Sequence, residues 1–203
     1  MADAAHKERG LLNDLKRLAA VKRRKAARNP LFAPVLLMSL VIIVIDQISK
    51  HIVLYASPLG GEYCSPTTPE FCGRIELSGI FDLTMVWNRG VSFGLFAGGM
   101  TSRVIFSTLS IVVAFGLLIW LTNLRRRVAA IGVGLIIGGA LGNAYDRIIY
   151  GAVVDFLDFS GLYFPYVFNI ADASINIGVA CLAYDAFFGG DGKTTQKNAD
   201  KGT

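Results

Sequence analysis

Four apolar runs constrain this chain more than any other feature, at residues 32–55, 104–124, 128–150 and 166–188. Each reaches the roughly 20 residues that an α-helix needs to cross the hydrocarbon core of a bilayer. Only 17% of the residues are charged, against about 25% in an average soluble domain. We therefore predict an all-α membrane protein with four transmembrane helices, because a helix satisfies its own backbone hydrogen bonds in lipid.

Basic residues are segregated along the chain and predict its orientation. Nine Lys and Arg residues lie within residues 1–30, three at 125–127 and three more between 193 and 201. These clusters precede the first run, separate the second from the third and follow the fourth. Cytoplasmic loops carry an excess of Lys and Arg, so both termini are expected in the cytoplasm. Topology and attraction to anionic lipid explain the clusters better than nucleic-acid contact does.

With this orientation, the chain divides into three predicted parts. Residues 1–30 form a basic cytoplasmic extension, which is either a helix on the membrane surface or a disordered tail. Residues 31–188 form the four-helix membrane domain, and residues 189–203 form a cytoplasmic tail. Within the membrane domain, residues 56–100 are polar and rich in β-formers, so we predict a small β-platform on the periplasmic face between the first two helices.

The three cysteines carry a weaker signal. Cys64 and Cys72 stand eight positions apart in the predicted platform. In an oxidising compartment they would form a local disulfide, whereas in the cytosol such a pair could be half of a metal site. No His lies near either, and Cys181, alone in the fourth run, is expected to serve packing.

Ionisable groups at membrane depth cost roughly 2.5–3.5 kcal/mol each on insertion scales, so several of them together predict a functional site. Asp46 and Lys50 in the segment DQISK share one helix face. They form either a neutralising ion pair or an anchor for a polar site. Asn88 and Gly90 in WNRGVSFGLF indicate a turn, although the Asn amide could also bind a peptide backbone.

The segment GGALGNAYDR ends the third run with several polar side chains. Asn143 and Arg147 share one helix face, and Asp146 lies beside Asn143. The planar guanidinium of Arg147 could orient carboxylates or hold a substrate headgroup. Gly142 belongs to a stripe of small residues at every fourth position, which is typical of close helix packing.

Two carboxylates flank the loop between the third and fourth runs. Asp155 in VVDFLDF follows the third run, and Asp172 in FNIADASIN opens the fourth, on one helix face with Asn169. Neighbouring carboxylates at a partly desolvated site cannot both ionise easily, so one keeps a proton and the pair supplies an acid and a base. This favours an intramembrane aspartyl peptidase.

Two other classes of function remain as alternatives. A proton-coupled membrane transporter also uses intramembrane carboxylates, but it would spread polar residues through the whole membrane depth, whereas here they gather on the outer side. A thiol oxidoreductase would need a close pair such as Cys-x-x-Cys, which the spacing of Cys64 and Cys72 does not provide.

Together, the blocks DQISK, NRGVSFGLF, GGALGNAYDR, GAVVDF and FNIAD resemble, in this order, the bacterial lipoprotein signal peptidases, the signal peptidase II family. The resemblance spans residues 46–172. It implies an aspartyl endopeptidase that removes the signal peptide of a prolipoprotein just before a diacylglyceryl-modified Cys. It places the catalytic pair on Asp155 and Asp172. The supporting or substrate-binding residues that it implies are Asp46, Lys50, Asn88, Gly90, Gly142, Asn143, Asp146, Arg147 and Asn169.

The resemblance also implies a setting in the bacterial inner membrane, with the active site facing the periplasm. The expected partners are lipid-modified prolipoprotein substrates and membrane phospholipid. We expect a monomer, with no cofactor, no metal and no nucleic-acid partner. The chain departs from the family pattern in its long N-terminal extension and in residues 60–73, which look inserted. Asp82 and Asp158 match no carboxylate of the family.

Overall fold

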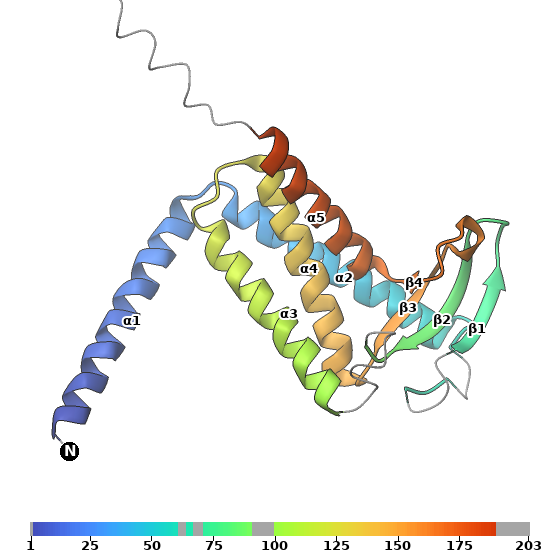
Figure 1. Cartoon of the computed structure of the whole chain (residues 1–203), viewed down its shortest axis with the longest axis horizontal. Helices are drawn as coiled ribbons and strands as arrows, with labels where there is room; N and C mark the ends of the chain where they lie inside the picture. Colours follow the sequence, from blue (N-terminus) through green and yellow to red (C-terminus); the bar gives the residue numbers. More distant parts are fainter. Residues whose placement is uncertain (1, 61–63, 67–70, 91–99, 190–203) are drawn as a thin grey trace, which may run out of the picture.

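The computed structural model describes residues 2–60, 64–66, 71–90 and 100–189. Its helices pack into a bundle with a small sheet at one end, while the N-terminal helix splays away from the other end (Figure 1). The α-helices are α1 (Ala2–Arg28), α2 (Phe32–His51), α3 (Met100–Leu121), α4 (Arg127–Ile149) and α5 (Ile170–Phe188). A π-helical turn, η1 (Ile52–Ala56), continues α2, and a short 3-10 helix, η2 (Ser160–Leu162), follows β3. The strands are β1 (Phe71–Glu76), β2 (Asp82–Asn88), β3 (Val153–Asp158) and β4 (Val167–Phe168).

Among the described residues, the four predicted membrane helices are present in the predicted order. The segment of α2 with η1, together with α3, α4 and α5, is long and apolar enough to cross a membrane. The fourth begins at Ile170 and not near residue 166, because Asn169 caps α5 and the two residues before it form β4. Residues 2–28, for which the sequence left a helix and a disordered tail open, form α1.

The central helix is α4, which packs against α2, α3 and α5 and is mostly buried. The predicted stripe of small residues lies against α2, where a Cβ at Gly138 would come within 2.9 Å of the carbonyl oxygen of Ser39. A second close approach, to α5, was not predicted: a Cβ at Gly132 would lie 2.7 Å from the carbonyl oxygen of Gly178. Glycines on two faces of α4 therefore let both neighbouring helices approach its backbone.

The sheet is antiparallel, with strand order β1-β2-β3-β4. Its first two strands come from the predicted platform, but β3 and β4 come from the connection between α4 and α5. The prediction of a platform within residues 56–100 was therefore incomplete. Val86 on β2 lies opposite Asp155 on β3, so Asp155 belongs to the sheet. A pairing between strands so distant in sequence leaves no local signal. The position of the sheet on the outer face of the membrane stays a prediction.

Cys64 and Cys72 form the predicted disulfide, which packs at the edge of a hydrophobic cluster that includes Leu59 and Trp87. Within the sheet, Arg74 pairs with Asp82. The other carboxylate without a family match, Asp158, accepts a hydrogen bond from Thr84 Oγ1 at 2.7 Å. Both acids therefore hold the sheet together. Residues 61–63, 67–70 and 91–99 of the predicted platform, and residues 190–203 of the predicted tail, lie outside the described residues.

Candidate active site

A buried cluster of three charged side chains joins α2 to α4. Lys50 Nζ lies 2.8 Å from Asp46 Oδ2 and 2.8 Å from Asp146 Oδ2. None of the three residues is more than 2% exposed. Buried charges are tolerated when they are paired and their remaining hydrogen-bonding capacity is satisfied. One cation between two carboxylates leaves one negative charge, so the carboxylates need further donors.

Those donors come from three other places in the chain. The backbone N–H of Ala171, in the first turn of α5, donates to Asp46 Oδ1 at 2.9 Å. The backbone N–H of Val154, on β3, donates to Asp146 Oδ2 at 3.2 Å. Gln47 Nε2 donates to Asp146 Oδ1 at 2.9 Å. The cluster therefore ties α2, α4, α5 and β3 together.

Gln47 is a residue of this site that the sequence reasoning missed. Its amide also lies 3.2 Å from Asp46 Oδ2 and 3.3 Å from the carbonyl oxygen of Gly142. A signal was present, because Gln47 stands inside DQISK next to Asp46. Gly142 itself is needed for space, since a Cβ there would come 2.7 Å from Asp46 Oδ2.

Asp155, on β3, is 1% exposed and accepts hydrogen bonds on both carboxylate oxygens. Asn169 Nδ2 donates to its Oδ1 at 2.6 Å, and Asn88 Nδ2 donates to its Oδ2 at 2.9 Å. Asn88 also accepts a hydrogen bond from the backbone N–H of Gly90 at 3.0 Å. The carbonyl of Asn88 therefore forms the predicted turn and its amide contacts Asp155, while the binding of a peptide backbone by this amide stays a prediction.

Asp172 lies in the first turn of α5 and reaches the same site. Asn143 Nδ2 donates to Asp172 Oδ1 at 2.7 Å. Asn169, the N-cap of α5, forms a capping box with Asp172, and its Nδ2 donates to Asn143 Oδ1 at 3.1 Å. The structure thus brings Asp155 and Asp172 together through the two Asn side chains.

Arg147 forms one wall of the site. Its guanidinium lies 5.5 Å from the ring centroid of Phe106, on α3, and interacts electrostatically with Asp172 and Asp155. Gly90 lies against the same ring, has a φ of +132°, and would place a Cβ 3.1 Å from it. Gly90 is therefore required both for its backbone conformation and for space. Phe106 was not predicted, because an apolar residue within a membrane helix carries no distinguishing signal.

Burial raises the pKa of Asp155 to about 7, and the negative charge of Asp172 acts in the same direction. The hydrogen bonds from Asn88 and Asn169 and the charge of Lys50 act against this rise. At neutral pH Asp155 is therefore protonated in about half of the molecules, so it can give or take a proton in that range. Because the ordinary pKa is 3.8, the contribution of Asp155 to folding stability is complete below about pH 4 and is lost as the pH rises through about 7.

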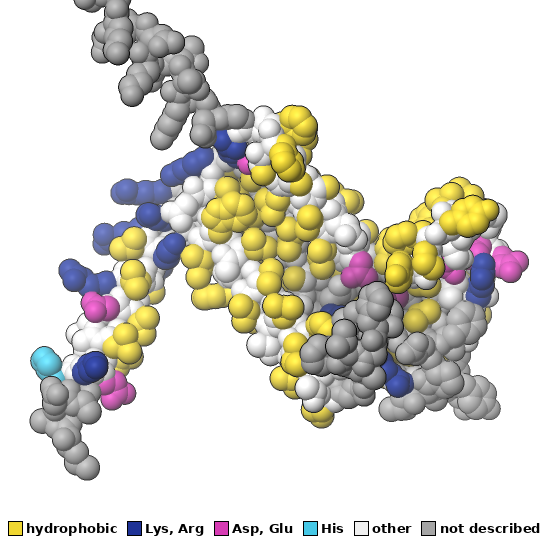
Figure 2. Space-filling model, in the orientation of Figure 1, with side chains coloured by type: hydrophobic (Ala, Val, Ile, Leu, Met, Phe, Trp, Pro, Cys, Tyr) yellow, Lys and Arg dark blue, Asp and Glu magenta, His cyan; other side chains and the backbone are white. Residues whose placement is uncertain are grey.

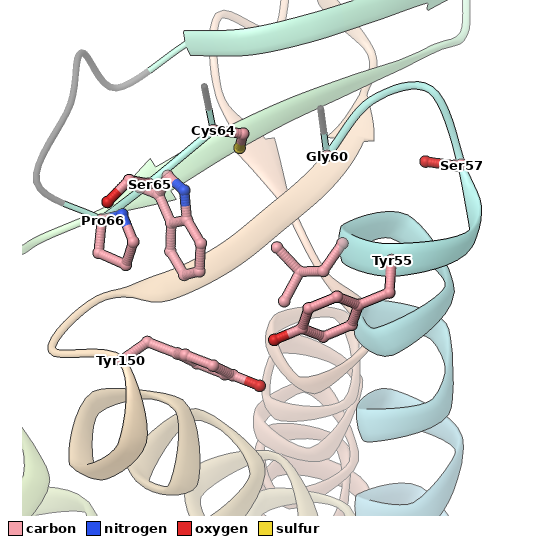
Figure 3. A pocket seen from close by; sticks show the side chains of 9 residues that line it. Tyr55, Ser57, Gly60, Cys64, Ser65, Pro66 and Tyr150 are labelled. Carbon is pink, nitrogen blue, oxygen red and sulfur yellow. The ribbon is translucent and has the colours of Figure 1, made fainter. Parts of the chain in front are cut away.

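A pocket of about 450 Å³, shown in Figure 3, is lined by neither Asp155 nor Asp172. It is lined by residues that include Tyr55, Trp87 and Tyr150. Trp87 and Asn88 are neighbours on β2, and neighbouring side chains point to opposite faces of a strand. The polar site is therefore on one face of the sheet and this pocket on the other. Among the described residues, no three His, Cys, Asp or Glu side chains gather as a metal site would require.

Comparison with known proteins gives a consistent picture. The family model of signal peptidase (SPase) II matches residues 38–188. The lipoprotein signal peptidase of Caulobacter vibrioides is 45% identical over 158 residues, which cover 77% of this chain and 88% of that protein. The lipoprotein signal peptidase of Rhodopseudomonas palustris is 41% identical over 159 residues, covering 75% and 91%.

A solved structure of a bacterial membrane enzyme, determined by the in meso method at 1.9 Å resolution, has the same fold. It superposes with a TM-score of 0.63 and 24% sequence identity, covering 77% of this chain and 94% of that chain.

We predict that the pKa of Asp155 moves in opposite directions in two variants. Asp172→Asn removes a neighbouring negative charge and lowers the pKa, whereas Asn88→Ala removes a donor to the carboxylate and raises it. Infrared titration of the carboxyl band that disappears in Asp155→Asn measures both shifts. Thr84→Val is the matched control, because Thr84 lies on the same strand as Asn88 but donates to Asp158. This change should leave the titration of Asp155 unchanged. Shifts in the same direction would contradict this account of the site.

Proposed function

The chain belongs to the signal peptidase II family, an aspartic endopeptidase family that removes signal peptides from prolipoproteins, and we propose that it cleaves just before a diacylglyceryl-modified Cys with Asp155 and Asp172 as its catalytic pair. One observation carries the assignment of the pair. A strand and a helix start bring two carboxyl groups into one network of amide hydrogen bonds, and the pKa of one is about 7.

In the proposed reaction, Asp172 is the base and Asp155 the acid. Asp172 takes a proton from a water molecule as the water oxygen bonds to the scissile carbonyl carbon, and Asp155 gives its proton to the carbonyl oxygen. The C–N bond then breaks. The proton on Asp172 passes to the leaving nitrogen, and a hydroxyl of the tetrahedral intermediate returns a proton to Asp155. The cycle ends in the starting protonation state and requires no metal or covalent intermediate.

The surrounding residues have supporting roles in this proposal. Asn143 and Asn169 hold the two carboxyl groups by direct hydrogen bonds. Arg147, which stands beside Asp172 and Asp155, would contact the substrate or its headgroup. Asn88 and Gly90 shape the turn next to Asp155. Asp46, Lys50, Gly142 and Asp146 would fix the helix positions on which these contacts depend.

The setting is also part of the proposal. We place the protein in the bacterial inner membrane, with both termini and the basic clusters in the cytoplasm and the sheet and Asp155 at the periplasmic face. Membrane phospholipid then surrounds a monomeric enzyme that has no nucleic-acid partner. The transporter alternative receives no support from the comparisons.

Loss of either acid should abolish cleavage in a folded protein. We predict that Asp155→Asn and Asp172→Asn each reduce cleavage of a lipidated prolipoprotein by at least about 10²-fold, the lower end of what general acid–base catalysis contributes. Asp158→Asn is the matched control, because Asp158 is a buried acid on the same strand that bonds Thr84 instead. Cleavage assays of the purified proteins decide the matter, and full activity in either variant would remove that Asp from the catalytic pair.

The lipid on the substrate should be required. A buried acyl chain gains about 0.8 kcal/mol per CH₂, so a diacylglyceryl group can hold the cleavage site at the membrane surface beside the pair. We expect a prolipoprotein to be cleaved when it is lipidated and to resist cleavage when the same sequence is presented without the lipid. Equal cleavage of both substrates would indicate a general aspartyl peptidase and would overturn the lipoprotein-specific assignment.

A further inference from the structure

Helix α1 lies outside the proposed catalytic function. The family match begins at residue 38, so α1 (Ala2–Arg28) is not part of it. Leu11, Leu15 and Leu18 recur at helical spacing and form an apolar stripe, with Leu12 and Val21 at its edges. These five side chains are 49–61% exposed. An apolar stripe of this kind predicts that something covers it.

The other side of α1 is basic. Figure 2 shows apolar side chains along the side of α1 that faces the bundle, with Lys and Arg mostly on the outer side. The exposed cations include Lys16, Arg17, Arg23 and Arg24. On a helical projection Arg17 and Arg24 lie opposite Leu15, and Lys16 and Arg23 lie at the side of the helix, roughly a quarter of a turn from Leu15. This combination of an apolar stripe and a cationic face is typical of a helix that lies in a membrane interface.

The base of α1 is fixed at the end of the membrane helices. Asn29, which is 4% exposed, donates to the carbonyl oxygens of Leu121 at 2.7 Å and Leu124 at 2.9 Å, just after α3 ends. Lys25 Nζ donates to Asn123 Oδ1 at 3.1 Å in the same turn. Arg125, Arg126 and Arg127 follow directly. The chain therefore leaves α1 beside the end of α3, where the second basic cluster begins.

We propose that α1 is an interfacial helix that binds the anionic phospholipids of the leaflet at this end of the bundle. The apolar stripe enters the boundary between headgroups and acyl chains, and the cations contact lipid phosphates. Charge complementarity favours anionic lipid as the partner. Nucleic acid would also attract the cations, but it would leave the stripe of Leu11, Leu15 and Leu18 in water.

The test uses the full chain in lipid nanodiscs, with Cys181→Ser to remove the free thiol and no reductant, so that the disulfide stays closed. An environment-sensitive fluorophore is attached at Leu18→Cys, on the stripe. The matched control is Asn13→Cys, which is exposed and lies on the opposite side of α1. Discs of phosphatidylcholine alone are compared with discs that also contain phosphatidylglycerol.

We expect the label at Leu18→Cys to shift to the blue in the anionic discs and to be quenched by lipids with a spin label in their acyl chains. The label at Asn13→Cys should keep its aqueous emission in both kinds of disc. Arg17→Gln, Arg23→Gln and Arg24→Gln should each lower the ratio of bound to free α1 about fivefold at low salt. Added salt should release the helix.

Three results would overturn the proposal. These are aqueous emission from Leu18→Cys in anionic discs, a blue shift independent of lipid charge and salt, and a blue shift that appears only when RNA is added. The second result would indicate a protein contact on the stripe, and the third a nucleic-acid partner. None of these readouts depends on cleavage, so the proposed peptidase function is tested separately.

Discussion

Lys50 is the cation on which the arrangement of the other elements depends. It stands on α2 between Asp46 and Asp146, and these carboxylates in turn accept backbone hydrogen bonds from Ala171 on α5 and Val154 on β3. Such a cluster adds little stability over a well-packed apolar core. Removing one partner, however, typically costs about 3–5 kcal/mol, because a buried charge is left without compensation. The cluster therefore favours one relative placement of four elements over the alternatives.

The same cation sets the orientation of the site's amides. Lys50 and Asn169 both donate to Asn143 Oδ1, at 3.2 and 3.1 Å. With its carbonyl oxygen committed to these donors, the amide of Asn143 must present its Nδ2 to Asp172. Asn169 accepts a hydrogen bond from the backbone N–H of Asp172 on its Oδ1 and presents its Nδ2 to Asp155. A buried charge on α2 is thereby connected to both carboxylates through two amide side chains.

The sequence predicted the helices and most of the polar residues that the structure brings together, because polar residues at membrane depth are conspicuous. It did not predict that Asp155 lies on a strand, since the pairing of β3 with β2 joins segments that are distant in the chain. Nor did it predict Gln47 or Phe106, whose roles appear only when helices meet. The spacing of Cys64 and Cys72 left two options open, and the structure shows the disulfide.

The most direct test of this account is the cleavage rate of the double variant Asp46→Asn/Lys50→Met on a lipidated prolipoprotein. The double change removes one carboxylate and one cation, so the net charge of the cluster is unchanged. Asp146 keeps its hydrogen bonds from Gln47 and from the backbone of Val154, so the fold should persist in thermal unfolding. Without the ammonium group Asn143 loses one of the two donors that orient it. A misplacement of about 1 Å can cost about 10²-fold in rate. The account predicts a folded protein with cleavage reduced by about that factor. Cleavage at the wild-type rate would contradict it.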